Sequence, residues 1–165
     1  MGNSIKKAYF AAGCFWGVEH WFKKITGVVD TTVGYCGGIV ENPNYEQVLK
    51  GNTGHLETVE VVYDESKVSF SDLVKVFFEI HDYTQIDGQG PDIGPQYLSA
   101  IFVNNVVEKE IVKKHILFLE SKGDKVETKI LPFKKFWPAE EYHQDYYSKT
   151  MQIPYCHIRK NINWD

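Results

Sequence analysis

Hydrophobic and polar positions along the chain switch between a two-residue repeat and a helical repeat. Residues 56–63 alternate strictly, which predicts a half-buried strand. From Phe15 to about Ile25, apolar residues recur at spacings of three and four, which predicts a helix closed by Gly27. By the same criteria we expect further strands at 5–12, 28–35, 98–103 and 126–131, and helices at 69–81 and 107–121.

The resulting order β-α-β-β-α-β-α-β predicts an α+β fold. We expect a two-layer sandwich in which helices pack on a mixed sheet, with a ferredoxin-like or split βαβ core. Residues 82–96 and 133–165 show no regular repeat, and long loops of this kind are often functional. A chain of 165 residues suits one domain, so 1–165 is expected to be a single catalytic domain with 146–165 as an irregular C-terminal tail.

Composition narrows the class of protein. The chain is 43% hydrophobic and 15% aromatic, which is typical of a globular protein and not of a disordered one. Its net charge of −4 argues against nucleic acid as a partner. No apolar run is long enough to span a membrane, and the N-terminus does not fit a signal peptide. Three cysteines are too few for a disulfide scaffold, so we expect a reducing, cytoplasmic location.

Cys14 is the first candidate for chemistry, because it falls between a predicted strand and a predicted helix. The amide donors and dipole of a helix N-terminus favour a thiolate. A buried structural cysteine is the alternative. Phe15 and Trp16 follow directly and could form an apolar pocket for a small group, although core packing would explain each of them as well.

Cys14 also lies in the first of six short motifs. In chain order they are 13–17 (Gly-Cys-Phe-Trp-Gly), 33–38 (Val-Gly-Tyr-Cys-Gly-Gly), 42–45 (Asn-Pro-Asn-Tyr), 53–57 (Thr-Gly-His-Leu-Glu), 89–97 (Gln-Gly-Pro-Asp-Ile-Gly-Pro-Gln-Tyr) and 139–144 (Ala-Glu-Glu-Tyr-His-Gln). Together they resemble the A-type peptide methionine sulfoxide reductases over most of the chain. The resemblance implies a thiol-dependent reductase of methionine S-sulfoxide, free or in proteins, that repairs oxidised proteins.

The resemblance implies catalytic roles for five residues. Cys14 would attack the sulfoxide sulfur, and Glu57, protonated in an apolar site, would donate to the sulfoxide oxygen. Tyr45 and Tyr97 match the tyrosines whose hydroxyls bind and polarise that oxygen. Asp92 matches a loop aspartate that organises the site. Without the resemblance, strand alternation alone would favour an outward-facing Glu57, and a turn would explain Asp92.

Further residues would bind the substrate methyl group and complete the cycle. Phe15 and Trp16 would hold the S-methyl group. Attack would leave a sulfenic acid that condenses with a thiol. Cys156 resembles the family's resolving cysteine, although Pro154 stands where a glycine of the mobile tail is usual. Cys36, or no cysteine of this chain, is the alternative resolver, and a thioredoxin-like partner would reduce the disulfide. Neither metal nor organic cofactor is implied, and we expect a monomer.

Four other functions compete with this interpretation. A cysteine hydrolase or acyltransferase would pair Cys14 with His55 or His143 as a base. A thiol peroxidase would share the sulfenic acid and would need no methyl pocket. A metal-binding or interaction domain is disfavoured because no Cys-x-x-Cys or His-x-x-x-His pair occurs. A binding module for oxidised methionine that lacks turnover is the last alternative.

Overall fold

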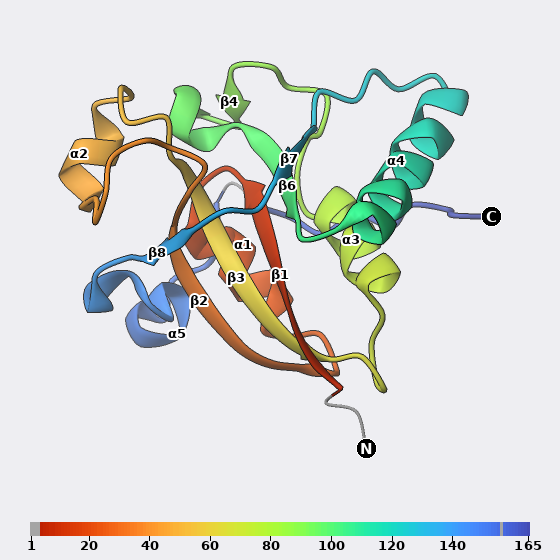
Figure 1. Ribbon diagram of the computed structural model, residues 1–165, viewed down its shortest axis with the longest axis horizontal. Helices are drawn as coiled ribbons and strands as arrows, with labels where there is room; N and C mark the ends of the chain where they lie inside the picture. The colour runs from red at the N-terminus through yellow and green to blue at the C-terminus, as the bar shows by residue number, and fades with distance from the viewer. Residues whose placement is uncertain (1–3, 156) are drawn as a thin grey trace.

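Six strands form one mixed sheet in the computed structural model, which describes residues 4–155 and 157–165 (Figure 1). They are β1 (Ile5–Ala12), β2 (Val28–Cys36), β3 (Leu56–Asp64), β6 (Ser99–Val103), β7 (Lys129–Pro132) and β8 (Phe136–Pro138). Their order across the sheet is β7-β6-β1-β3-β2-β8. All neighbours are antiparallel except β6 and β7, which run parallel. The predicted α+β architecture with a mixed sheet is therefore confirmed.

The helices and the remaining short elements connect these strands. They are α1 (Phe15–Phe22), α2 (Tyr45–Leu49), α3 (Phe70–Glu79), α4 (Val106–Ser121) and α5 (Tyr146–Thr150), with the 3-10 turns η1 (Pro95–Tyr97) and η2 (Glu141–His143) and a small hairpin of β4 (Gly88–Gln89) and β5 (Asp92–Ile93). Helix α1 passes behind the sheet in Figure 1, and α3 packs beside α4. No helix in the described parts of the chain is long and apolar enough to cross a membrane.

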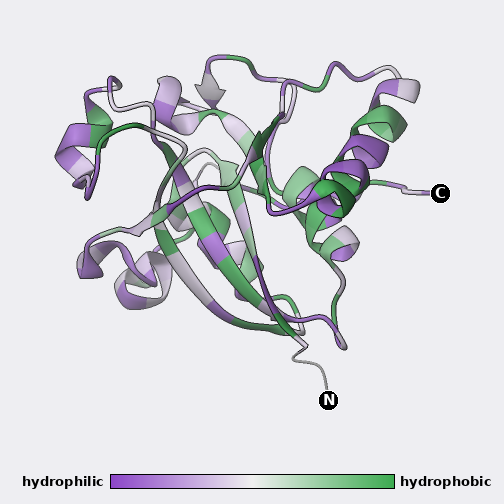
Figure 2. Ribbon diagram, in the orientation of Figure 1, coloured by the Kyte–Doolittle hydropathy of each residue, from purple (hydrophilic) through white to green (hydrophobic). Residues whose placement is uncertain are grey.

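Alternation along β1 separates two apolar layers. Phe10 faces the helices, where its ring stacks on Phe22 of α1 with centroids 4.7 Å apart and lies 5.6 Å from Phe77 of α3. Tyr9 faces the opposite side, and there Phe133 stacks on it at 3.9 Å. The segment between β7 and β8 thus covers the second face, as it crosses in front of the strands in Figure 1. Burial on both faces explains why hydrophobic residues are frequent along the central strands in Figure 2.

The predicted helices and strands are all present, with shifted ends. Helix α1 ends at Phe22 and not near Ile25, because single turns follow in which the Ile25 amide bonds to the Phe22 carbonyl. Gly27, with a φ of +100°, closes those turns and not the helix itself. Strand β7 begins at Lys129, later than the expected 126. The elements without a sequence prediction are α2, α5, β4, β5 and β8, and each is too short for a repeat to register.

Candidate active site

Cys14 is the N-cap residue of α1, at the junction that the sequence predicts. Its side chain is buried, and its carbonyl oxygen accepts a hydrogen bond from the Gly17 amide at 3.2 Å. Gly13 before it has a φ of +92°, and a Cβ there would lie 2.5 Å from the Cβ of Gln89. The glycine therefore lets the 82–96 loop approach the nucleophile, which gives that loop a place in the site.

Glu57 lies on β3 and faces the helices. It is 1% exposed, and one carboxyl oxygen accepts a hydrogen bond from the Phe15 amide at 3.2 Å. The other oxygen, Oε2, is buried with no hydrogen-bond partner among the described residues. Burial, and secondarily the negative charge of Cys14, raise the pKa of Glu57 well above its usual value. The outward orientation that alternation seemed to favour is wrong, because Glu57 shares its face with the buried Val59 and Val61.

Tyr45 and Tyr97 come from two short elements beside this carboxyl group. Tyr45 is the first residue of α2, which Asn44 caps through a reciprocal pair with Gln47. Tyr97 ends η1. Burial raises the pKa of both tyrosines, and the charges of Glu57 and Cys14 raise them further. Both therefore stay protonated as neutral donors.

Asp92 begins β5, at the tip of the 82–96 loop. Its carboxylate accepts from the hydroxyl of Tyr155, at 3.0 Å to Oδ2 and 3.2 Å to Oδ1. After burial and the charge of Glu57, the charge of Asp92 raises the pKa of Tyr97. The structure thus brings Glu57, Tyr45 and Tyr97 near enough to Cys14 for its charge to raise their pKa values, and Asp92 near enough to affect Glu57 and Tyr97.

Phe15 and Trp16 follow Cys14 directly, as the first two residues of α1. Phe15 is fully buried, with its ring 5.7 Å from that of Tyr35 and 6.3 Å from that of Tyr45. Trp16 is half-buried and stacks on Tyr146 of α5 at 3.7 Å. Phe15 therefore belongs to the core as well as to the neighbourhood of the site, and Trp16 is held in one orientation.

Two residues of the 139–144 motif support the site, and sequence reasoning gave them no such role. Glu140 accepts from the Tyr35 hydroxyl and from the Tyr45 amide, both at 3.0 Å, so it fixes the start of α2. His143 accepts at Nδ1 from the indole N–H of Trp16 at 3.0 Å. Its Nε2 is buried without a hydrogen-bond partner among the described residues, and its ring lies 4.3 Å from that of Tyr45. The motif itself was the only signal for them.

Neither of the two histidines considered as a base, His55 and His143, is shown to hydrogen-bond to Cys14. In His55, Nδ1 accepts from the Gly38 amide at 3.0 Å and Nε2 donates to the Val40 carbonyl at 2.6 Å, so both ring nitrogens bond to a nearby loop. Neither nitrogen of His143 bonds to the sulfur. This arrangement disfavours the hydrolase. Among residues 4–155 and 157–165, no group of three His, Cys, Asp or Glu side chains could hold a metal ion.

Of the two remaining cysteines, Cys36 and Cys156, the structure describes only Cys36. Cys36 is buried on the face of the sheet opposite Glu57, and its Sγ donates to the Lys135 carbonyl at 3.2 Å. Burial raises the pKa of its thiol to about 12. Cys156, the expected resolver, lies outside the described residues.

A thiol at a helix N-terminus, beside two phenols and a buried carboxyl group with a raised pKa, is the arrangement of a thiol-based enzyme that can protonate an oxygen next to the sulfur. The family model "Peptide methionine sulfoxide reductase" matches residues 6–165. The chain belongs to this family.

Known members of this family are similar in sequence and in structure to nearly the whole chain. Peptide methionine sulfoxide reductase MsrA of Nautilia profundicola is 49% identical over 152 residues, which cover 92% of this chain and 88% of that protein. The reduced form of Mxr1 from Saccharomyces cerevisiae superposes with a TM-score of 0.88 at 36% identity, covering 96% of this chain and 93% of that one. The same yeast protein in complex with Trx2 superposes with a TM-score of 0.64 at 27% identity, covering 96% of this chain and 91% of that one.

Proposed function

We propose that this site reduces methionine S-sulfoxide, free or within proteins, to methionine, in the repair of oxidised proteins. The observation that carries the proposal is Glu57, an almost fully buried carboxyl group whose Oε2 has no partner among the described residues and whose pKa burial raises well above its usual value. A buried donor beside a thiol is what a sulfoxide needs, since its sulfur is electrophilic and its oxygen leaves only once protonated.

Each functional group takes a defined part in the first step. The Cys14 thiolate attacks the sulfur, and Glu57 gives a proton to the oxygen. Tyr45 and Tyr97 donate hydrogen bonds to that oxygen, and Asp92 holds the surrounding loop. Phe15 and Trp16 contact the methyl group, with Trp16 held by His143. In net terms, a thiol and a sulfoxide become a sulfenic acid and a thioether, so the oxygen passes to Cys14.

The second step returns the enzyme to its thiol form through a disulfide. Cys156 attacks the sulfenic acid; a sulfur–sulfur bond forms, the sulfur–oxygen bond breaks, and water leaves. Cys36 is the weaker resolver, because its thiol is buried on the other face of the sheet with a pKa of about 12. A thioredoxin-like protein then reduces the disulfide by exchange. The yeast relative in complex with Trx2 supports this partner.

We extend the proposal to the domain and its surroundings. Residues 1–165 form one catalytic domain that acts as a monomer, and the tail begins within 146–165, after the short α5. The order β6-β1-β3-β2, with α1 and α3 packed against one face, supports a split βαβ core. A reducing, cytoplasmic compartment suits a disulfide that exists only during turnover.

Separate assays of the two sulfoxide epimers test the reaction. With dithiothreitol as reductant, the enzyme should consume the S epimer of an N-blocked methionine sulfoxide and leave the R epimer. Cys14→Ser should abolish turnover. If neither epimer is consumed, or if an acyl-enzyme forms on an ester substrate without any reductant, the proposal is wrong.

The resolver is tested in the same system. Cys156→Ser should produce one equivalent of methionine per enzyme and then stop when thioredoxin is the only reductant. Cys36→Ser should cycle at the wild-type rate. The reverse result would assign resolution to Cys36.

A further inference from the structure

A cavity of about 280 Å³ lies between α3 and α4, and Trp164 of the tail completes its lining. We call it the α3–α4 cavity. None of the residues assigned to catalysis lines it. An apolar cavity of about 150 Å³ is enough to hold benzene, so this one has room for an aromatic ring with a charged group attached. Its size therefore suits a small organic ligand.

One wall of the cavity is aromatic and held in place. The rings of Trp164 and Phe118 pack with their centroids 5.6 Å apart. The indole N–H of Trp164 donates to Oε2 of Glu79, the last residue of α3, at 3.2 Å. Glu79 is 9% exposed, and its Oε1 pairs with Arg159 at 3.0 Å. The aromatic wall therefore has a fixed geometry, so a ligand that stacks on it orders few side chains on binding.

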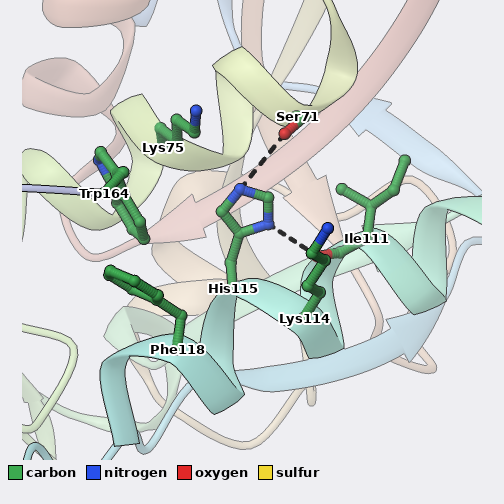
Figure 3. A pocket seen from close by; sticks show the side chains of 7 residues that line it. All are labelled: Ser71, Lys75, Ile111, Lys114, His115, Phe118 and Trp164. Carbon is green, nitrogen blue, oxygen red and sulfur yellow. Dashed lines mark hydrogen bonds between the residues drawn. The ribbon is translucent and has the colours of Figure 1, made fainter. Parts of the chain in front are cut away.

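His115 forms a buried polar wall beside these rings. It is 8% exposed, and its Nδ1 donates to the Ile111 carbonyl at 2.7 Å. Its Nε2 lies 3.3 Å from the Ser71 hydroxyl, and Figure 3 shows both bonds. The second bond is long for a hydroxyl donor, so the Ser71 hydroxyl can turn toward a ligand oxygen at little cost. The cavity thus offers a hydrogen-bond donor next to its aromatic wall.

Two cations flank His115 in Figure 3, Lys75 of α3 and Lys114 of α4. Burial lowers the pKa of His115, and the charges of both lysines lower it further. Among residues 4–155 and 157–165, neither lysine forms an ion pair. The carboxylate of Asp72, whose charge also reaches His115, is engaged in the N-terminal cap of α3. The polar side of the cavity is therefore positive and suits an anion.

We propose that the α3–α4 cavity binds a small aromatic carboxylate. The ring stacks on Trp164 and Phe118, and the carboxylate meets the charges of Lys75 and Lys114 and accepts from the Ser71 hydroxyl. A neutral aromatic molecule would leave the two cations without a partner, and an inorganic anion would leave the aromatic wall unused. The lining therefore favours both groups in one molecule. This inference is independent of the proposed function, because no residue of the cavity takes part in sulfoxide reduction.

Titration of the full chain with phenylacetate tests the site. Phenylacetamide, which has the same shape and no charge, is the matched control ligand. Heteronuclear NMR follows the indole N–H of Trp164, identified by its absence in Trp164→Leu, and the amides of α3 and α4. Phenylacetate should bind with a Kd of about 1 mM at low salt, the affinity expected for about ten non-hydrogen atoms. Phenylacetamide should bind at least about fivefold more weakly, and salt should weaken phenylacetate alone.

Variants assign the two parts of the ligand to the two parts of the lining. Lys75→Gln and Lys114→Gln should each raise the Kd of phenylacetate about two- to fivefold. Trp164→Leu removes the stacking surface and should raise it about three- to tenfold for both ligands. Lys113→Gln removes the same charge from the exposed Lys113–Glu110 pair on α4, so it should leave the Kd within about twofold of wild type. The lysine variants keep the test informative even if Trp164→Leu fails to fold.

Three outcomes would overturn the inference. A Kd above about 10 mM for phenylacetate would show that the cavity is no binding site for this class of ligand. Equal affinity for phenylacetamide would show that the cations contribute nothing. Equal weakening in Lys113→Gln and Lys75→Gln would show attraction to the net charge of the protein and not to the cavity.

Discussion

Replacing Glu57 by glutamine should remove the proton donor with little change in shape. Glutamine can still accept from the Phe15 amide through its carbonyl oxygen, and its amide group can occupy the place of Oε2. It cannot transfer a proton to the leaving oxygen. General acid catalysis contributes about 100- to 10,000-fold, so kcat should fall by that factor, or about 3–5 kcal/mol in activation free energy. KM should change much less, because a hydrogen-bond donor remains.

The pH profile gives the sharper test. The proposed mechanism requires protonated Glu57, whose pKa is raised by burial and then by the charge of Cys14, so activity should fall as pH rises through this elevated pKa. In Glu57→Gln that alkaline limb should disappear. The assay is kcat for the S epimer from pH 5 to 9 with dithiothreitol, alongside thermal unfolding. Because a buried carboxyl is replaced by a neutral amide, the melting temperature should stay the same or rise.

Two results would refute this reasoning. One is a kcat for Glu57→Gln within threefold of wild type. The other is an alkaline limb that survives the substitution, which would assign that ionisation to another group. A fall in both kcat and melting temperature would show disruption of the fold, and Glu57→Asp, which retains a carboxyl group, would then separate the two effects by its pH profile.

Two further predictions concern the tyrosines and a buried histidine. Tyr45→Phe and Tyr97→Phe should each lower kcat/KM for the S epimer by about tenfold, because each removes one hydrogen-bond donor of about 1–2 kcal/mol. The double variant should lower it further. A double variant with unchanged kcat/KM would exclude both tyrosines from the mechanism. His81 donates from Nδ1 to the Phe77 carbonyl at 2.7 Å and accepts at Nε2 from Ser99 at 2.8 Å, and burial lowers its pKa to about 3. Its folded-state pKa lies below the unfolded value of about 6.5, so its contribution to stability is complete above pH 6.5 and is lost as pH falls toward 3, by about 1.4 kcal/mol per pH unit. Urea unfolding between pH 6.5 and 5 should show a slope at least this steep, because burial also lowers the pKa of His115, His143 and His157. His81→Asn should show a smaller slope, and equal slopes would contradict the prediction.

The sequence anticipated the long elements well and the short ones not at all. Repeats over eight or more residues identified β1, β3 and α3, because each buries one periodic face. Helix α2 has only five residues, although Asn44 and Gln47 form a capping box that a closer search for caps could have found. Strand β8 depends on pairing with β2, which no local pattern reveals.

For the site, local sequence determined the position of Cys14 at the N-terminus of α1. A strand followed by a glycine and then a helix fixes that position without any contact from distant parts of the chain. Motifs supplied the residue types at 45, 57, 92 and 97. Only the tertiary structure decided their environment. Glu57 is suited to donate a proton because β3 buries it under α1, and burial raises its pKa well above the usual value.

The same division holds for the tail. From the sequence, residues 146–165 were expected to be an irregular tail because they show no regular repeat, and a mobile tail was only what the family resemblance implied. The structure attaches them through contacts with residues far away in the chain, His157 against Gly17 and Arg159 against Glu79. The sequence alone thus indicated the class of reaction and a candidate nucleophile. Burial and long-range contacts, which depend on the whole fold, decided which carboxyl has a raised pKa and what holds the tail.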